Sequence, residues 1–583
     1  WKSKAQMIRV STDVFIVGAG GAGMYAAVAA ARAGASALLA DKSLISRGGA
    51  TIMAQMTVAA AVGHEEPDHW THHLADTIEA GHGLCNERLS AILCEEAPIR
   101  IMEMDRWKVG WARENGRMTQ VHAPGHGLKR CVYVDYLNTG PAVARTLRGE
   151  VAQGPGITRA SGLAVIDILV RDGEAVGAVA IDVESGETVL IEASAIILAA
   201  GGLTRLYQRN SASVNMAGEA YAMALRAGAE LIDMEFVQFF PIGHLAPRLV
   251  GMDPIMWDPF RYKVGGRLLN GNFEEFIHNY GASDDGTYTA RRDVASYAIT
   301  REVEAGRGSP HGGVWLSFEH IPDEVMQDKF GPMIGRLANN GIDLSRSAIE
   351  VSPIAHYHMG GVRVDDDMHT RVPGLFAAGE AVGGANGATR LSGNAISEAF
   401  VFGERAGRFA ATYAIQAKGD RSRIALDEAA ATAALAKPRG QIKRGASLDG
   451  GAAALIKELQ ALMWDKVGLF RNSEALDEAL ARIREMQRSD MARMEIPDNA
   501  PFNQALLDWY ELRAGLLCAE AVTLSAINRV ESRGAHQRED IPQASPDFER
   551  NQTMVLEGGE LITGWEDVPR ISYTLEDKRA ATV

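Results

Sequence analysis

Cysteine is scarce in this chain. Only four cysteines occur in 583 residues, and no two of them stand at C-x-x-C spacing. That spacing is typical of redox pairs, zinc sites and iron–sulfur clusters, so we expect no metal site and no cysteine-ligated cluster in the chain itself. Scarce cysteine also argues against a disulfide framework and favours a reducing, cytoplasmic compartment.

Long apolar runs and excess positive charge are missing too. No run approaches the about 18 consecutive apolar residues of a membrane-spanning helix, so we expect membrane contact only through partners. Lys and Arg number 59 against 74 Asp and Glu, a formal net charge of -15. Because binding to nucleic acid needs a basic surface, a general nucleic-acid binder is disfavoured.

Glycine is plentiful, with 61 residues, and its clusters follow strand-like runs. Residues 13–17 are apolar and β-branched, G-A-G-G-A-G follows at 18–23, and an Ala-rich stretch comes next. This is the strand, turn and helix context of the G-x-G-x-x-G fingerprint, whose glycines make the turn, admit a pyrophosphate and let the helix pack on the strand. Asp41 ends the next strand, where it can bind a ribose hydroxyl. The cofactor-binding candidates here are Gly18, Gly20, Gly21, Gly23 and Asp41.

Further strand-like runs divide the chain into units. They lie at residues 163–170, 175–181, 195–200 and 374–380. They predict a discontinuous nucleotide-binding domain, residues 1–240 and 345–420, with an insertion between its two parts. Apolar residues then recur at helical spacing, which predicts a helical domain over 421–535, followed by a polar C-terminal segment at 536–583.

Several longer blocks resemble the flavoprotein subunits of the succinate dehydrogenase and fumarate reductase family, whose relatives include L-aspartate oxidase and the adenylylsulfate reductase flavoprotein. Besides the fingerprint, the blocks are M-E-F-V-Q-F at 234–239, R-D-V at 292–294, H-Y-H-M-G-G at 356–361, residues 374–403 and S-R-G-A-H-Q-R-E-D at 532–540. The resemblance runs nearly end to end. It implies an α/β fold: a Rossmann-like FAD-binding domain with an inserted α+β capping domain at 241–344, followed by a C-terminal helical domain.

The resemblance implies FAD rather than NAD as the cofactor. Glu380, Asn394 and Ser397 stand at a strand-to-helix turn, where an acid can bind ribityl hydroxyls and backbone N–H groups can face the flavin. Further FAD contacts are implied at Lys42, Thr51, Gln55, Ala200, Gly201 and Glu219.

A covalent flavin link is not expected. Many family members bond the flavin to a histidine just before a T-V-x-A-Q stretch, but here residues 48–55 read G-G-A-T-I-M-A-Q and Ala50 takes that place. The resemblance therefore implies non-covalent FAD. Without the potential-raising bond, the reductive direction or a more easily oxidised substrate is favoured.

Three residues match the catalytic groups of the family, in which a hydride moves between flavin and one carbon of a C–C bond next to a carboxylate. Arg292 matches the arginine that handles the proton on the neighbouring carbon. His356 and Arg390 match the pair that holds one substrate carboxylate, a task for which a planar guanidinium is suited. The resemblance thus implies an FAD-dependent oxidoreductase acting on CH–CH bonds of a small carboxylic acid.

The other end of the substrate pocket departs from the family. Members that act on fumarate or succinate read Q-F-H-P-T-G, whereas residues 238–243 read Q-F-F-P-I-G, so Phe240 and Ile242 replace a histidine and a threonine. Asp258 aligns with the T-E pair of the cap. A second carboxylate would lose its donors in a buried site, at a cost of several kcal/mol. We therefore expect a substrate other than plain fumarate or succinate, with a larger or apolar group facing Phe240 and Ile242.

Three alternatives stay open. The first is an ordinary fumarate reductase or succinate dehydrogenase flavoprotein in which His244 or His358 replaces the lost histidine. The second is chemistry of the adenylylsulfate reductase type, and the third is a non-catalytic flavoprotein that relays electrons. The helical domain and the 532–540 block imply a partner, an Fe–S electron-transfer subunit, whereas an oxidase would work alone.

Overall fold

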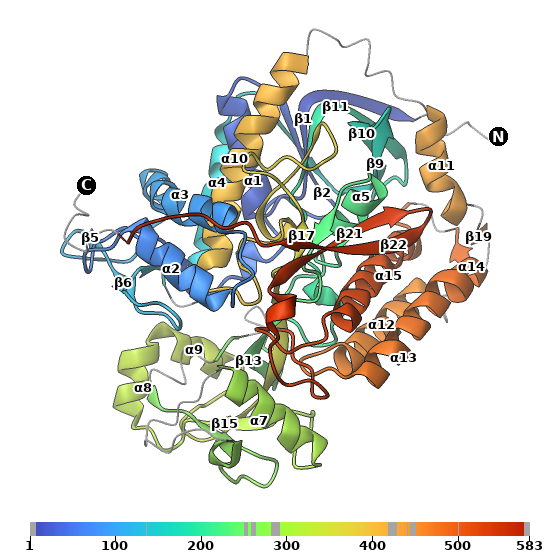
Figure 1. Cartoon of the computed structure of the whole chain (residues 1–583). Helices are drawn as coiled ribbons and strands as arrows, with labels where there is room; N and C mark the ends of the chain where they lie inside the picture. The colour runs from blue at the N-terminus through green and yellow to red at the C-terminus, as the bar shows by residue number, and fades with distance from the viewer. Residues whose placement is uncertain are drawn as a thin grey trace.

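The computed structural model describes residues 7–135, 137–249, 255–257, 264–280, 292–417, 428–439, 441–443, 451–498 and 501–575. Asp258 and the side chain of Arg292 lie outside the described part. Figure 1 shows a central sheet with helices around it, a separate unit that contains β13, β15 and α7–α9, and a group of C-terminal helices beside the sheet. This arrangement confirms the α/β fold class with an inserted cap and C-terminal helices.

The central sheet has the strand order β8-β2-β1-β11-β10-β9, with β18 also paired to β11. Its parallel strands are β1 (Ile8–Val17), β2 (Ala37–Asp41), β8 (Ile157–Ser161), β11 (Thr188–Leu198) and β18 (Leu375–Ala377). β9 (Leu163–Arg171) and β10 (Glu174–Asp182) pair antiparallel. Strand β1 is buried from Val14 to Val17, as expected for an apolar strand covered on both faces.

Helices cover this sheet. α1 (Gly21–Arg32) packs along α10 (Asn394–Ala417), and this is the most extensive contact between two helices in the described part of the chain (Figure 1). The other helices of this domain are α2 (Trp70–Ala80), α3 (Glu87–Arg106), α4 (Thr139–Gln153), α5 (Glu219–Arg226) and α11 (Glu428–Arg439). Of the helices described, none is both long and apolar enough to cross a bilayer.

The cap has its own sheet, ordered β13-β16-β15-β14. Its elements are β13 (Val237–Ala246), β14 (Arg267–Leu269), α7 (Arg292–Glu304), β15 (Val314–Ser317), α8 (Asp323–Phe330), α9 (Pro332–Asn339) and β16 (Ile349–His358). The apolar side chains of these elements form a core separate from that of the central sheet. The chain enters the cap along β13 and leaves it along β16, its antiparallel neighbour.

The C-terminal helices share the main core with the central sheet. They are α12 (Ala452–Lys466), α13 (Ser473–Glu485), α14 (Met491–Arg493) and α15 (Gln504–Asn528). The chain then forms a hairpin, β21 (Arg550–Glu557) and β22 (Glu560–Asp567), whose first strand pairs with β12 (Leu231–Ile232). β17 (Gly361–Val362) pairs with the other side of β12. The C-terminal hairpin is therefore part of a four-stranded sheet ordered β17-β12-β21-β22.

Candidate active site

A cavity of about 2050 Å³ runs between the central sheet, the cap and the C-terminal region. The sheet borders the cavity with the edge at which its parallel strands end. At this edge Val17, Leu198 and Ala377 lie in register at the ends of β1, β11 and β18. Ligands of open α/β sheets bind at this edge. The predicted residues that line the cavity are Gly18, Gly20, Gly21, Asp41, Lys42, Thr51, Gln55, Ala200, Gly201, Glu219, Phe240, His356, Glu380 and Arg390.

The glycine loop shapes one end of the cavity. Gly18 has a φ of +102°, and a Cβ there would lie 2.5 Å from Ala199 O. A Cβ on Gly23 would lie 1.8 Å from Gly18 O, so helix α1 can approach the loop only with glycine at this position. A Cβ on Gly20, by contrast, would meet only Thr51 Oγ1 at 3.9 Å and would take up cavity space. The loop and the helix N-terminus therefore form a cradle that fits a pyrophosphate.

Charged side chains are fixed beside this cradle. Asp41 accepts hydrogen bonds from Ala19 N at 2.9 Å and Ser43 N at 2.8 Å, so its carboxylate is oriented by the loop itself. Lys42 forms ion pairs with Glu219 and Glu511. Burial alone would lower the pKa of Lys42. The two carboxylates raise it by more than burial lowers it, so the net pKa lies above the ordinary value. The ammonium group is therefore charged and held in place.

Glu380 follows β18 and lines the cavity with a partly buried side chain. Its Oε1 accepts a hydrogen bond from His358 N at 3.1 Å. Burial raises the pKa of Glu380 to about 8, so at neutral pH its carboxyl group is largely protonated and can donate a hydrogen bond. A neutral acid of this kind is suited to a hydroxyl or carbonyl partner.

Asn394 and Ser397 do not lie on the cavity wall. The Asn394 side chain bonds His73 Nε2 at 2.8 Å, and the Ser397 hydroxyl donates to Ala59 O. The first turn of α10 therefore points these side chains into the protein, toward α2 and β3 (Val58–Ala59). Gly393, just before the helix, forms the wall instead.

His356 and Arg390 reach the cavity from different elements. His356 stands on β16, where its Nδ1 is 2.8 Å from the hydroxyl of Ser211. Arg390 precedes α10, and its guanidinium carbon lies 4.4 Å from the centre of the Tyr357 ring. The Tyr357 hydroxyl donates to the buried carboxyl of Glu398. The two groups predicted to hold a carboxylate thus line the same cavity, and each is supported by a neighbour.

Phe240 and Met256 lie on the cavity wall, and both pack against Ile354, which is buried behind them. Ile242 does not line the cavity, because its side chain is fully buried in the cap core. The reason is a bulge in β13: Phe240 pairs with Ile354 and Gly243 with Ser352, so two residues of β13 lie opposite one of β16. Without the bulge, Phe240 and Ile242 would point to the same face of β13. With it, the Ile242 side chain points into the core of the cap.

His244 and His358, which the ordinary fumarate reductase alternative requires as carboxylate ligands, both form hydrogen bonds away from the cavity. His358 is fully buried, with Nδ1 3.1 Å from the Tyr221 hydroxyl and Nε2 3.0 Å from Met234 O. His244 accepts a hydrogen bond from Trp257 Nε1 at 3.0 Å. Neither histidine is among the residues that line the cavity.

Gln238 is a cavity residue that the sequence did not single out. Its Nε2 donates to Arg390 O at 3.0 Å, while its Oε1 is buried without a hydrogen-bond partner and so fits a donor on a bound molecule. Gln238 lies two residues before Phe240 on β13, and the period-two rule for strand faces was the signal that could have found it.

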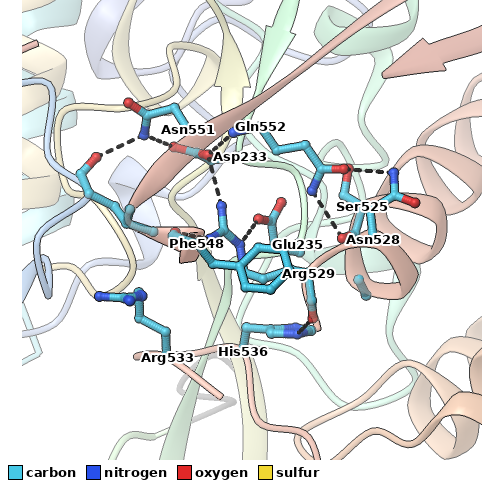
Figure 2. Close-up of polar contacts among 12 residues, drawn as sticks. Asp233, Glu235, Ser525, Asn528, Arg529, Arg533, His536, Phe548, Asn551 and Gln552 are labelled. Carbon is cyan, nitrogen blue, oxygen red and sulfur yellow. Dashed lines mark hydrogen bonds and ion pairs between the residues drawn. The ribbon is translucent and has the colours of Figure 1, made fainter. Parts of the chain in front are cut away.

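A buried ionic cluster surrounds Arg529 (Figure 2). Arg529 forms ion pairs with Glu235, with Glu531 at 3.2 Å and with Asp233 at 3.7 Å, and all four side chains are at most 1% exposed. Burial, reinforced by Glu235, raises the pKa of Asp233 above its ordinary value. The cluster fixes the start of residues 529–540, a segment that contributes Ser532 and its neighbours to the cavity wall.

The glycine cradle, the oriented acid and the unpaired amide oxygen fit a flavin dinucleotide. A family model described as "FAD binding domain" matches residues 13–396, and one described as "Fumarate reductase flavoprotein C-term" matches residues 456–574. The chain belongs to the fumarate reductase/succinate dehydrogenase flavoprotein family. It is an FAD-dependent oxidoreductase of the kind that acts on a C–C bond, as the resemblance implied.

Similar proteins cover nearly the whole chain. A fumarate reductase (CoM/CoB) subunit of Methanothermobacter marburgensis is 35% identical over 92% of this chain and 96% of its own length. The solved structure of Mycobacterium smegmatis Sdh1 in complex with UQ1 has a TM-score of 0.87 at 32% identity, covering 97% of this chain and 96% of that one. An adenylylsulfate reductase from Archaeoglobus fulgidus has a TM-score of 0.73 at 19% identity over 98% of both chains, a likeness of fold alone.

Proposed function

We propose that this chain uses non-covalently bound FAD to reduce, or in reverse to form, the C–C double bond next to a carboxylate in an acid whose far end is apolar. The observation that carries the proposal is the position of Phe240. Its ring lies on the cavity wall and meets the ring of His356 edge-on, with centroids 5.5 Å apart. An aromatic edge stands where a dicarboxylate would need a second donor.

The cofactor would be held by groups at both ends of the cavity. The loop of Gly18, Gly20 and Gly21 would take the pyrophosphate, Asp41 a ribose hydroxyl, and Glu380 a polar group nearer the flavin. When bound, FAD supplies a site that exchanges a hydride with one carbon of the substrate. Ala50 lines the same cavity and has no atom that can bond to a flavin, which supports non-covalent binding.

His356 and Arg390 would hold the carboxylate next to the reacting bond. Stacking on Tyr357 holds the Arg390 guanidinium in one orientation, and the hydrogen bond with the Ser211 hydroxyl orients the His356 ring. A fixed, planar cation can bind both carboxylate oxygens at once. The withdrawal of charge onto these donors makes the adjacent double bond a better hydride acceptor.

Arg292 would provide the proton for the neighbouring carbon. It is the first residue of α7, and Val294, Ser296 and Tyr297 of the same helix line the cavity, so the helix brings its N-terminal end to the substrate. An arginine keeps its proton in ordinary surroundings, so it must be reprotonated at once after it acts.

Phe240 and Met256 would contact the far end of the substrate. Since His244 and His358 have other partners away from the wall, neither supports a second carboxylate site. An unpaired carboxylate in such a place would cost several kcal/mol, whereas an alkyl, aryl or ester group would gain from burial.

Electrons would reach the flavin through another protein. The sequence contains no C-x-x-C motif, and several similar proteins are named as subunits. We propose that the partner is an Fe–S electron-transfer subunit, in the cytoplasm or at the membrane's cytoplasmic face.

The test is reduction of α,β-unsaturated acids by the purified holoprotein, with reduced viologen as donor and mass analysis of the product. The proposal predicts saturated acids from substrates with an apolar far end. Preferred reduction of fumarate would favour the ordinary dicarboxylate enzyme. Turnover of adenylylsulfate with sulfite release would favour the second alternative, and absence of any turnover in holoprotein with reducible flavin would favour an electron relay.

A further inference from the structure

Helix α7, which begins at Arg292, contacts the C-terminal part of the chain near its other end. Arg301 forms an ion pair with Glu539, and its guanidinium carbon lies 5.6 Å from the centre of the Phe470 ring. Tyr297, one turn earlier, meets the same ring edge-on with centroids 5.2 Å apart. Two side chains of α7 therefore pack against two side chains of the C-terminal region.

Phe470 and Glu539 belong to one hydrogen-bonded unit. Arg471 N donates to Gln537 O at 3.0 Å, and Glu539 N donates to Arg471 O at 2.8 Å, in a parallel bridge between Arg471 and Arg538. The residues next to Phe470 are thus joined by backbone bonds to those next to Glu539. We call residues 470–471 and 537–539 the platform.

Buried charges anchor this platform. The Arg471 guanidinium is fully buried and donates to His536 Nδ1 at 2.7 Å and to Glu235 O at 2.8 Å. Burial and the Arg471 charge hold the pKa of His536 well below its ordinary value, so its ring is neutral and can accept. Figure 2 shows His536 close to the Arg529 cluster, and His536 Nε2 lies 3.0 Å from Arg529 O. Movement of the platform would break these buried hydrogen bonds, which therefore hold it in place.

The same segment supports the loop that carries Arg390. Ala535 N donates to Ala388 O at 2.9 Å. Gly534 has a φ of +54°, and a Cβ there would lie 2.5 Å from Ala388 O, so the contact requires glycine. One segment therefore touches the loop of Arg390 on one side and, through Glu539, the helix of Arg292 on the other.

The cap needs such a contact because its hydrophobic core is separate from the main core. Units with separate cores can shift relative to one another unless side chains join them. We propose that Arg301 and Glu539 are positioning residues, which hold α7 on the platform and so place Arg292 opposite the carboxylate site of Arg390. This inference rests on the proposed roles of Arg292 and Arg390.

The test compares Arg301→Gln, Glu539→Gln and the double variant with the wild-type holoprotein, using the unsaturated acid that gives the highest kcat/KM. Both partners are about one-third exposed, so we expect each single variant to lower kcat about 3- to 10-fold. The double variant should be no slower than either single one, and Arg301→Lys should retain most of the wild-type kcat. The substrate Kd, from a flavin absorbance titration, should stay unchanged because His356 and Arg390 are intact.

Glu304→Gln is the matched control. Glu304 pairs with Arg301 at 2.5 Å from within α7 and is half exposed, but it is not part of the platform. This variant should keep the wild-type kcat. Additive losses in the double variant, an unchanged kcat in Arg301→Gln, or an equal loss in Glu304→Gln would each overturn the inference.

A second measurement needs no substrate. Iodide quenching of flavin fluorescence should increase in Arg301→Gln and Glu539→Gln but not in Glu304→Gln, because a cap released from the platform exposes the cavity. Equal quenching in all variants would overturn the inference even if no acid is turned over. Failure of the proposed function and failure of this inference are therefore distinguishable.

Discussion

Phe240 and His356 meet edge to face in the cavity wall, with ring centroids 5.5 Å apart and ring planes inclined by 62°. His356 is one of the two groups proposed to bind the substrate carboxylate. The contact places hydrocarbon next to that proposed carboxylate site, and under our proposal Phe240 selects what the rest of the substrate can be.

Replacing Phe240 by histidine should shift selectivity toward dicarboxylates. A new donor would relieve the desolvation of a second carboxylate, so kcat/KM for fumarate relative to a mono-acid should rise about 5- to 150-fold, which is about 1–3 kcal/mol. The measurement is the ratio of the two kcat/KM values in wild type and variant with a dye donor.

Ile242→Thr is the control for that prediction. Ile242 is fully buried in the cap core, so a hydroxyl there should cost about 1–3 kcal/mol of stability and leave the selectivity ratio unchanged. A selectivity shift in Ile242→Thr as large as that in Phe240→His would refute the assignment of these two faces of β13.

Acid denaturation of the holoprotein should release intact FAD into the supernatant, because Ala50 offers no atom for a bond to the flavin. The check is chromatography of the supernatant together with a denaturing gel viewed under ultraviolet light. A protein band that stays fluorescent on the gel would contradict non-covalent binding.

Arg292→Gln should lower kcat by more than the ~100-fold of an ordinary general acid, since the proposed proton donor is lost while the proposed carboxylate site remains. Flavin absorbance and substrate Kd should not change. Arg336→Gln, an exposed position on α9 of the same cap, should keep normal turnover. Near-normal turnover in Arg292→Gln would move the proton role to another residue.

Much of the FAD end was predictable because it depends on local rules. Strand, glycine turn and helix at residues 13–32 follow from spacing alone, and Asp41 follows from the end of the next strand. The arrangement of residues on the cap side of the cavity was harder to predict from the sequence. The bulge that turns Ile242 away from the cavity depends on the register between β13 and β16, whose residues lie more than 100 positions apart. The pairing of Arg301 with Glu539 joins segments that no local pattern connects.

Arg529→Met should destabilise the protein strongly, by about 3–5 kcal/mol, because it leaves buried carboxylates without their cation. Arg363→Met is the matched control: Arg363 also pairs with two glutamates, Glu230 and Glu566, but is 44% exposed, and the change should cost less than about 1 kcal/mol. Denaturant unfolding measures both. Equal losses would show that burial of the Arg529 cluster is not what matters.

Glu398 should make stability depend on pH. Burial raises its pKa in the folded protein to about 7 from the ordinary 4.5, so the folded state holds the proton more tightly than the unfolded state. Its contribution is complete below pH 4.5 and is lost as pH rises toward 7, at ~1.4 kcal/mol per pH unit for one proton. Glu398→Gln should therefore flatten the decline of stability between pH 5 and 7, and parallel curves for the two proteins would contradict this.

The most direct test of the substrate proposal compares fumarate with its monomethyl ester, since the two share the same double bond and one carboxylate and differ only at the far end. The measurement is kcat/KM for both acids with reduced viologen and the unmodified holoprotein. We predict a preference for the monoester of about 10-fold or more, as one buried unpaired carboxylate requires. Equal or better use of fumarate would contradict the proposal that Phe240 excludes a second carboxylate.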